Sequence, residues 1–362
     1  MIPLVKPYIA PPSEMMPKIE SILYSGYIAE SEPVYNFERE FGDYIQNPNV
    51  ISVNSGTAAL HIALLMIGVG PGDEVISTAL TAEPTNTTIA LTGAKIVWAD
   101  VDIKTGLLDP KAVRESITEN TKAIMLVHYA GMVCDMNEFN KISKEFNIPI
   151  IEDTAHALGS RFMDKPIGSN SDYTCYSFQA IKHMTTVDGG MISFKSEKDC
   201  EIARRLRWFG LDKKKPRLMN DITRAGYKYN MNNVNATIGS VQLKHLDNII
   251  SRHVSNGKFY DKKLTETAGV TLIPYYKNTE PSYWLYTMKV EDRNNFIRMM
   301  KDQGIDASEL HLRSDRHSVF KDSKKDLPFL DEYYKSFVHI PCGWWVSDED
   351  RNRIVETIKK GW

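Results

Sequence analysis

Residues 148–156 of this 362-residue chain read Ile-Pro-Ile-Ile-Glu-Asp-Thr-Ala-His. The opening residues are apolar without alternation, which is typical of a strand buried on both faces of a parallel sheet. Asp153 follows where such a strand would end, and ligands of open α/β sheets bind outside the carboxyl ends of the strands. We therefore expect a buried strand that delivers Asp153 to a ligand site.

A similar pattern extends to both sides of this stretch. Short β-rich runs alternate with segments of helical spacing, which predicts a doubly wound, mostly parallel sheet covered by helices, an α/β fold. The expected strands are 50–53, 74–77, 95–101, 123–128, 148–152, 173–178 and 190–194, and the expected helices are 57–66, 85–91, 110–116 and 136–146. Asp109 and Asp135 are placed to cap the last two helices.

The pattern of helical and strand-like segments changes near residue 245. A long helical pattern runs from there to about residue 268, and a strand-like run over 270–274 follows. Because 362 residues exceed the usual size of one compact core, two domains are expected. We predict a large domain over 1–245 with an N-terminal arm, and a smaller C-terminal α/β domain over 246–362.

The composition argues against several classes of function. The chain has 44 basic and 46 acidic side chains, so its charge favours neither nucleic acid nor an anionic membrane as a partner. Its four cysteines have no close spacing that would indicate a metal site, and no run of about 20 apolar residues indicates a membrane span. We expect a cytoplasmic protein without a metal.

Lys182 is the candidate catalytic residue. It follows the apolar run 173–178 and precedes a Thr-Thr pair and Gly189-Gly190. An amine here and the carboxylate of Asp153 are the two contacts that pyridoxal phosphate needs most, one for its aldehyde and one for its ring nitrogen. Alone, Lys182 could be a surface lysine and Asp153 a helix cap.

A phosphate site is predicted in the stretch Val53-Asn54-Ser55-Gly56-Thr57-Ala58-Ala59. A strand there gives way to a helix through Gly56, and free N–H groups at a helix start hold phosphate. Ser177 could add a hydroxyl, and a simple capped turn is the alternative. His156 could lie against the cofactor ring, bond its phenolic oxygen, or be a packed core histidine.

A second glycine cluster, Gly68-Val69-Gly70-Pro71-Gly72, is not expected to bind a dinucleotide. It follows a helix and precedes a strand, which places it at the wrong end of the sheet for a ligand.

Five motifs in order resemble the DegT/DnrJ/StrS-type sugar aminotransferases, which have the aspartate aminotransferase (type I) fold. The resemblance covers nearly the whole chain. Its motifs are Asn54–Leu60, Pro71–Val75, Glu152–His156, Ser177–Lys182 with Thr185-Thr186 and Gly189-Gly190, and Gly239–Leu243.

The resemblance implies roles for individual residues. Lys182 would bind the cofactor aldehyde as an imine and move protons between the substrate carbon and the cofactor. Asp153 would pair with the pyridine nitrogen. The phosphate would be held by Gly56, Thr57 and Ser177. Since family members are homodimers with shared active sites, Lys228 and Asn230 are expected to reach the partner's cofactor.

Three positions depart from the family pattern. Ala82 stands where an aromatic usually stacks on the cofactor ring, Val187-Asp188 replaces Gly-Glu, and Lys228 replaces an asparagine. The donor-rich stretch 309–317 offers His311, Arg313 and His317 as substrate-binding residues, with a solvated loop as the alternative.

The sequence thus predicts an aminotransferase that uses pyridoxal 5'-phosphate to carry an amino group from glutamate to a keto-sugar. The leading substrate is a nucleotide-linked 4-keto-6-deoxyhexose, for cell-surface polysaccharide or glycoconjugate biosynthesis. One alternative keeps this chemistry on an octulosonate-type keto sugar acid or a small phosphorylated ketone. Another is a non-catalytic regulatory protein of the same fold.

Overall fold

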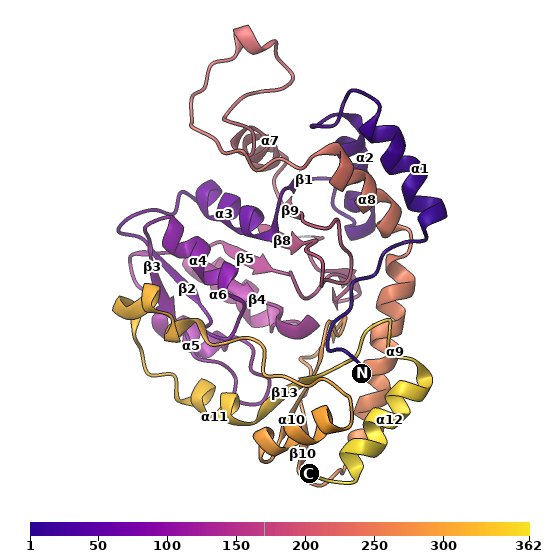
Figure 1. Cartoon of the computed structure of the whole chain (residues 1–362). Coiled ribbons are helices and arrows are strands. Elements are labelled where there is room, and N and C mark those ends of the chain that lie inside the picture. Colours follow the sequence, from indigo (N-terminus) through magenta and orange to yellow (C-terminus); the bar gives the residue numbers. More distant parts are fainter. Residues whose placement is uncertain (170) are drawn as a thin grey trace.

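The computed structural model describes residues 1–169 and 171–362. Within these residues the largest sheet has seven strands in the order β1-β9-β8-β5-β4-β2-β3 (Figure 1). The strands are β1 (Val50–Val53), β2 (Glu74–Ser77), β3 (Lys95–Trp98), β4 (Thr121–Val127), β5 (Ile150–Asp153), β8 (Tyr173–Ser177) and β9 (Gly190–Phe194). Only β9 runs antiparallel to its neighbours, β1 and β8, among the strands paired in this sheet of the described chain. The prediction of a doubly wound, mostly parallel sheet is confirmed.

Helices connect and cover these strands. They are α1 (Pro12–Leu23), α2 (Glu32–Ile45), α3 (Gly56–Ile67), α4 (Glu83–Leu91), α5 (Pro110–Ser116), α6 (Met136–Phe146), α7 (Glu197–Leu206), α8 (Asn233–Leu243) and α9 (Leu246–Leu264). Asp109 and Asp135 cap α5 and α6 as predicted, since their carboxylates accept from the amides of Lys111 and Glu138.

Several predicted bounds were wrong, and two of them have a plain physical reason. Helix α4 begins at Glu83 and not at Thr85, because Pro84 suits the first turn of a helix, where its missing N–H is not needed. Strand β3 ends at Trp98 and not at residue 101, because Val101 leaves the sheet and pairs antiparallel with Leu108.

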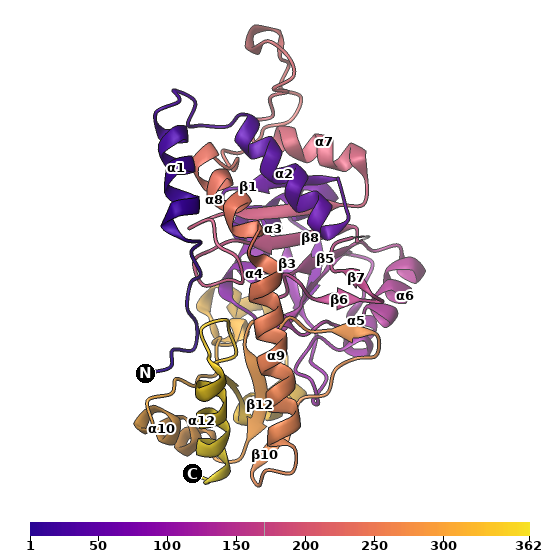
Figure 2. The same cartoon turned by 90° about the vertical axis from the view of Figure 1, so that its right-hand side faces the viewer.

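A second, antiparallel sheet lies in the C-terminal part of the chain. It has the order β10-β12-β13, with β10 (Val270–Leu272), β12 (Tyr286–Val290) and β13 (Phe337–Ile340). Around it lie α10 (Arg293–Asp302), α11 (Pro328–Ser336) and α12 (Asp348–Lys359). Helix α9 runs from the level of the large sheet down to this small sheet (Figure 2). Its Tyr260 and Leu264 belong to the small sheet's hydrophobic core.

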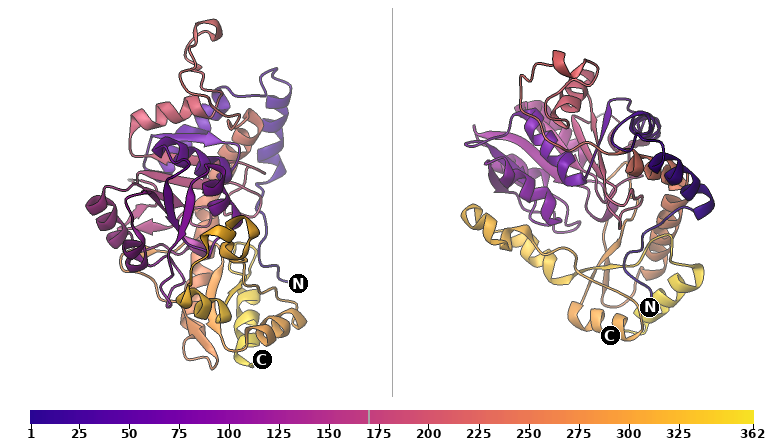
Figure 3. Two further views of the ribbon diagram at one scale, coloured as in Figure 1. Left: turned by 90° about the vertical axis from the view of Figure 1, so that its left-hand side faces the viewer. Right: turned by 45° about the horizontal axis from the view of Figure 1, so that its top comes forward.

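Part of the C-terminal region returns to the large sheet. The short helices η3 (Ser314–Arg316) and η4 (Ser318–Ser323) lead from the small sheet toward β3 (Figure 3). Phe320 packs edge-on against Trp98, with ring centroids 5.3 Å apart. The backbone amides of Phe329 and Leu330 donate to the Asp100 carboxylate. The predicted division at residue 245 stays a prediction, and this segment contributes to the core of the large sheet.

Smaller elements complete the chain. A three-stranded sheet joins β6 (Arg161–Phe162), β7 (Lys165–Pro166) and β11 (Thr279–Glu280), and η1 (Tyr129–Gly131) and η2 (Arg217–Met219) are further short helices. The segment between α7 and α8 projects from the body of the molecule (Figures 1 and 2). The four cysteines are buried and free. Among the described residues, no helix has the length and apolar character that crossing a membrane requires.

Candidate active site

Asp153 lies at the carboxyl end of β5 and is buried. Its Oδ2 accepts from the Thr85 hydroxyl at 2.7 Å, and its Oδ1 accepts from the Ala155 amide at 3.0 Å. Burial raises the pKa of the Asp153 carboxyl, while these two hydrogen bonds and the nearby charge of Lys182 act in the opposite direction. The segment that follows is a turn and not an α-helix, so Asp153 is not a helix cap. A carboxylate in this position is arranged to receive a cationic or donor group.

Lys182 lies in the turn after β8, facing the same cavity as Asp153. The turn is held by the Lys182 amide donating to Gln179 O at 3.0 Å and by the Thr186 amide donating to Phe178 O at 2.9 Å. Burial lowers the pKa of the Lys182 amine to about 8, although Asp153 opposes this shift. Both side chains line one cavity of about 280 Å³.

The predicted phosphate residues form another corner of this cavity, which Gly56, Thr57 and Ser177 also line. Ser55 caps α3 by accepting from the Ala58 amide at 3.1 Å. A Cβ at Gly56 would lie 2.8 Å from the Ser177 Cβ, so only glycine lets the start of α3 lie this close to the end of β8. First-turn amides have no partner within a helix, and together with the Ser177 hydroxyl they suit an anion.

His156 is buried beside these groups and stacks on Trp284, with ring centroids 3.9 Å apart and an interplanar angle of 16°. Burial, together with the charge of Lys182, lowers the pKa of His156 well below its usual range, so the ring is neutral at pH 7. Its Nδ1 accepts from the Ala130 amide at 3.4 Å. Its Nε2 is buried and has no hydrogen-bond partner among the described residues.

The three predicted substrate-binding residues differ in their surroundings. His311 lies parallel to His156 with centroids 5.8 Å apart. Arg313 is buried and already paired, since it donates to both oxygens of Asp315 at 3.0 and 2.6 Å and also to Asp331. His317 is half-buried beyond Arg313. Of the three, His311 is the one next to a residue that lines the cavity.

Lys228 and Asn230 lie next to the phosphate corner of their own chain. The Lys228 amine donates to Asn230 Oδ1 at 2.8 Å and lies 3.8 Å from the ring centroid of Trp208. Their segment follows the end of β1, because the Asn54 amide donates to Tyr229 O at 2.7 Å. The expected contact with a partner subunit stays a prediction.

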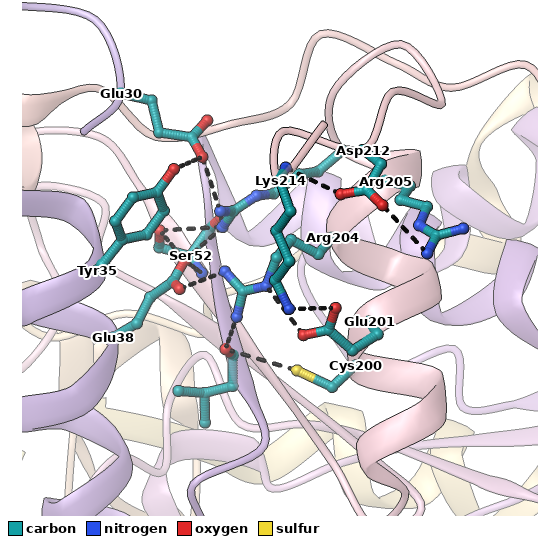
Figure 4. Close-up of polar contacts among 12 residues, drawn as sticks. Glu30, Tyr35, Glu38, Ser52, Cys200, Glu201, Arg204, Arg205, Asp212 and Lys214 are labelled. Atoms are coloured by element: carbon teal, nitrogen blue, oxygen red, sulfur yellow. Dashed lines mark hydrogen bonds and ion pairs between the residues drawn. The ribbon is translucent and has the colours of Figure 1, made fainter. Parts of the chain in front are cut away.

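A buried network of ion pairs holds the end of β1, which leads into the predicted phosphate site. Glu38 of α2 accepts from both the amide and the hydroxyl of Ser52 at 2.9 Å, and from Arg204 and Arg207 of the α7 region. Figure 4 shows Arg204 and Glu38 meeting beside Ser52, two residues before Asn54. The carbonyl oxygen of Arg207 also accepts a hydrogen bond from the Tyr229 amide at 2.9 Å. The network therefore joins β1 to the segment that carries Lys228 and Asn230.

Sequence reasoning missed Thr85 and Trp284. Thr85 precedes Asp153 by 68 residues, and Trp284 follows Lys182 by about a hundred, so spacing alone gave no sign of either contact. A threonine at a helix start and a tryptophan before a strand are ordinary features, and nothing in the sequence singles them out.

The donor set fits pyridoxal phosphate. The α3 amides suit its phosphate, Asp153 suits its ring nitrogen, Lys182 suits its aldehyde, and the free Nε2 of His156 offers one more hydrogen bond. Ala82 also lines the cavity, so aromatic surface comes here from His156, which stacks on Trp284, and not from residue 82.

The chain is similar to several known proteins. The model of the DegT/DnrJ/EryC1/StrS aminotransferase family matches residues 12–359. The spore coat polysaccharide biosynthesis protein SpsC of Bacillus subtilis is 30% identical over 96% of this chain and 94% of its own. The sugar aminotransferase CalS13 of Micromonospora echinospora is 35% identical, with a TM-score of 0.96 over all of both chains. The putative sugar aminotransferase Spr1654 of Streptococcus pneumoniae, solved in PLP and PMP forms, has a TM-score of 0.91 at 29% identity, covering 99% of this chain and 98% of its own.

The chain belongs to the DegT/DnrJ/EryC1/StrS aminotransferase family. The sequence expectations of this family, of its type I fold, of aminotransferase chemistry and of pyridoxal phosphate as cofactor are confirmed.

Proposed function

We propose that this protein transfers an amino group from glutamate to a keto-sugar, with a nucleotide-linked 4-keto-6-deoxyhexose as the leading substrate. The single observation that carries this proposal is that Lys182 and Asp153 share one cavity with the anion corner at Gly56. The names of the relatives SpsC and CalS13 support a sugar acceptor and a role in polysaccharide or glycoconjugate biosynthesis.

The bound cofactor supplies an electron sink that stabilises negative charge on the substrate carbon. Asp153 keeps the ring nitrogen protonated, and Thr85 and Ala155 hold its carboxylate in place. The Lys182 amine takes the proton from the donor carbon and returns a proton to the acceptor. With a pKa near 8, a sizeable fraction of this amine is neutral at physiological pH, which suits both directions of transfer.

The alternatives receive less support from the site. Free basic groups near Arg313 and the small Ala82 would favour an octulosonate-type or phosphorylated acceptor, but the Arg313 guanidinium already binds two carboxylates. The presence of both Lys182 and Asp153 in one cavity argues against a non-catalytic regulatory protein.

Spectroscopy of the purified protein tests the proposal. Loaded with pyridoxal phosphate, it should show a visible absorption band that shifts on adding glutamate, and adding the 4-keto sugar nucleotide should restore the band. A panel of keto-sugars, keto sugar acids and phosphorylated ketones separates the acceptors. Lack of a shift with glutamate or any other amino acid would favour the regulatory alternative.

Substitution of Lys182 gives the matched test. Lys182→Ala should lower turnover by at least about a thousandfold, because the proton-transferring amine is lost. Circular dichroism should show an intact fold. Lys195→Ala, at an exposed lysine after β9, should leave turnover unchanged.

We further propose a cytoplasmic homodimer with shared active sites. Exposed apolar side chains in the stretches before α2 and between α7 and α8 support a second copy as partner; they include Tyr24, Tyr27, Leu218 and Met219. Mixing Lys182→Ala protein with Asn230→Ala protein should restore activity in mixed dimers if Asn230 serves the partner's site. Absence of restoration, with dimers detected by light scattering, would place Asn230 at its own chain's site.

A further inference from the structure

We propose that Trp284 is a positioning residue that holds the amine of Lys182 on its indole ring whenever that amine is not bonded to the cofactor. This inference rests on the proposed function, because it concerns Lys182 between its covalent and free states. Its basis is geometric: the Lys182 Nζ lies 4.3 Å from the ring centroid of Trp284. An ammonium at this distance from an indole is attracted by the negative charge of the ring face.

The indole is fixed independently of the lysine. Its Nε1 donates to the carbonyl of Ile181 at 2.8 Å, which ties the ring to the very turn that carries Lys182. Its ring also stacks on His156. Trp284 is only 2% exposed and directly precedes the residues that lead into β12. The ring is therefore a rigid surface on which a flexible side chain can rest.

The charge states of the groups around Lys182 are compatible with a contact between its ammonium and the indole ring. Asp153 attracts the ammonium, whereas the neighbouring His156 and His183 are buried and His311 is partly buried. Burial lowers the pKa of each, so these histidines are neutral at pH 7. Among the described residues, Asp153 is the charged group that raises the pKa of the Lys182 amine. A π face stabilises the protonated amine without placing a second anion beside the cofactor site.

Competitive acetylation of full-length protein tests this role. The rate of Lys182 acetylation against pH, read by mass spectrometry, gives the pKa of its amine without cofactor and in protein loaded with pyridoxamine phosphate. Trp284→Leu should lower this pKa by about 0.5 to 1.5 units, and Trp284→Phe should lower it less because a ring remains. Lys228, which lies over Trp208, is the internal control and should not change.

Fluorinated tryptophans provide a second measurement that avoids a packing defect. Each added fluorine weakens the negative charge of the ring face, so the Lys182 pKa should fall stepwise across the series. An unchanged or raised pKa in both the Leu variant and the fluorinated series would overturn the proposal.

The result is separable from the proposed function. If the wild-type protein responds to glutamate while the Lys182 pKa ignores Trp284, the inference fails and the function stands. If the wild-type protein shows no response to any amino acid, the function fails whatever the acetylation shows. With both intact, Trp284→Leu should lower kcat and leave the KM for glutamate nearly unchanged, because Trp284 acts on the lysine and not on the donor.

Discussion

Single side chains set the electrostatics of this site. Asp153 is buried, and its charge depends on two hydrogen bonds, one from a backbone amide and one from the Thr85 hydroxyl. Thr85 in turn is hydrogen-bonded to Thr81 at 2.8 Å, so the first turn of α4 sets the state of an acid on β5. The sequence predicted the acid, but its donor could not be predicted because the two lie on different elements.

Removing the Thr85 hydroxyl should weaken catalysis. Thr85→Val leaves Oδ2 of Asp153 without its donor, which raises the pKa of the carboxyl further and should weaken its proposed contact with the cofactor nitrogen. A hydrogen bond to a charged group contributes about 1.5 to 3 kcal/mol, so we expect kcat to fall roughly 10- to 100-fold.

Thr87→Val is the control for this change. The Thr87 hydroxyl bonds only within its own helix, to Glu83 O at 2.9 Å, as far as the described residues show. Steady-state kinetics should find its kcat near the wild-type value. Equal losses in the two variants would mean that α4 itself, and not the hydrogen bond to Asp153, is at fault.

At the scale of elements, the end of β1 is positioned by helices that precede and follow it in the chain. Arg207 is fully buried and pairs with Glu30 at 3.0 Å and with Glu38, while Arg204 reaches the other oxygen of Glu38. Although burial opposes ionisation of Glu38, the two arginines lower its pKa. Binary patterning predicts β1 and its helix, but it cannot predict which charges are buried together behind them.

Arg207→Met should destabilise the fold strongly. The substitution leaves Glu30 and Glu38 buried with less positive charge, and breaking such a pair costs about 3–5 kcal/mol. Urea unfolding measures the loss. Arg205→Met, two positions earlier at a half-exposed pair with Asp212, should cost less than about 1 kcal/mol. Similar losses in both variants would contradict the buried network as the cause.

For the whole molecule, α9 joins the small sheet to the active-site layer. His253 of α9 contacts His183, the neighbour of Lys182, with ring centroids 4.6 Å apart, and its Nδ1–H donates to Tyr283 O at 2.8 Å. Burial lowers the pKa of His253 to about 4. The contact therefore brings together three parts of the chain that sequence spacing treats as unrelated.

This packing predicts how stability depends on pH. The native state keeps His253 neutral down to about pH 4, whereas the unfolded chain binds a proton near pH 6.5, so stability falls as the pH drops between these values. The loss is about 1.4 kcal/mol per pH unit for one such histidine. His253→Asn should reduce the slope of unfolding free energy against pH by about one proton. Ser251→Ala, an exposed and non-titrating change two positions earlier on α9, should leave the slope unchanged.

Local sequence was enough to predict the sheet, its helices and the carboxyl-end position of the site, and it is the basis for the proposed roles of Lys182 and Asp153. These follow from local periodicity, from residues next to strand ends and from motifs that are continuous in the chain. Three contacts could be read only from the folded chain: Thr85 donates to Asp153, Trp284 lies against Lys182, and Arg313 is paired with Asp315 and Asp331. Each of these depends on which side chains distant elements bring together, and that is settled by packing and burial and not by neighbours along the chain.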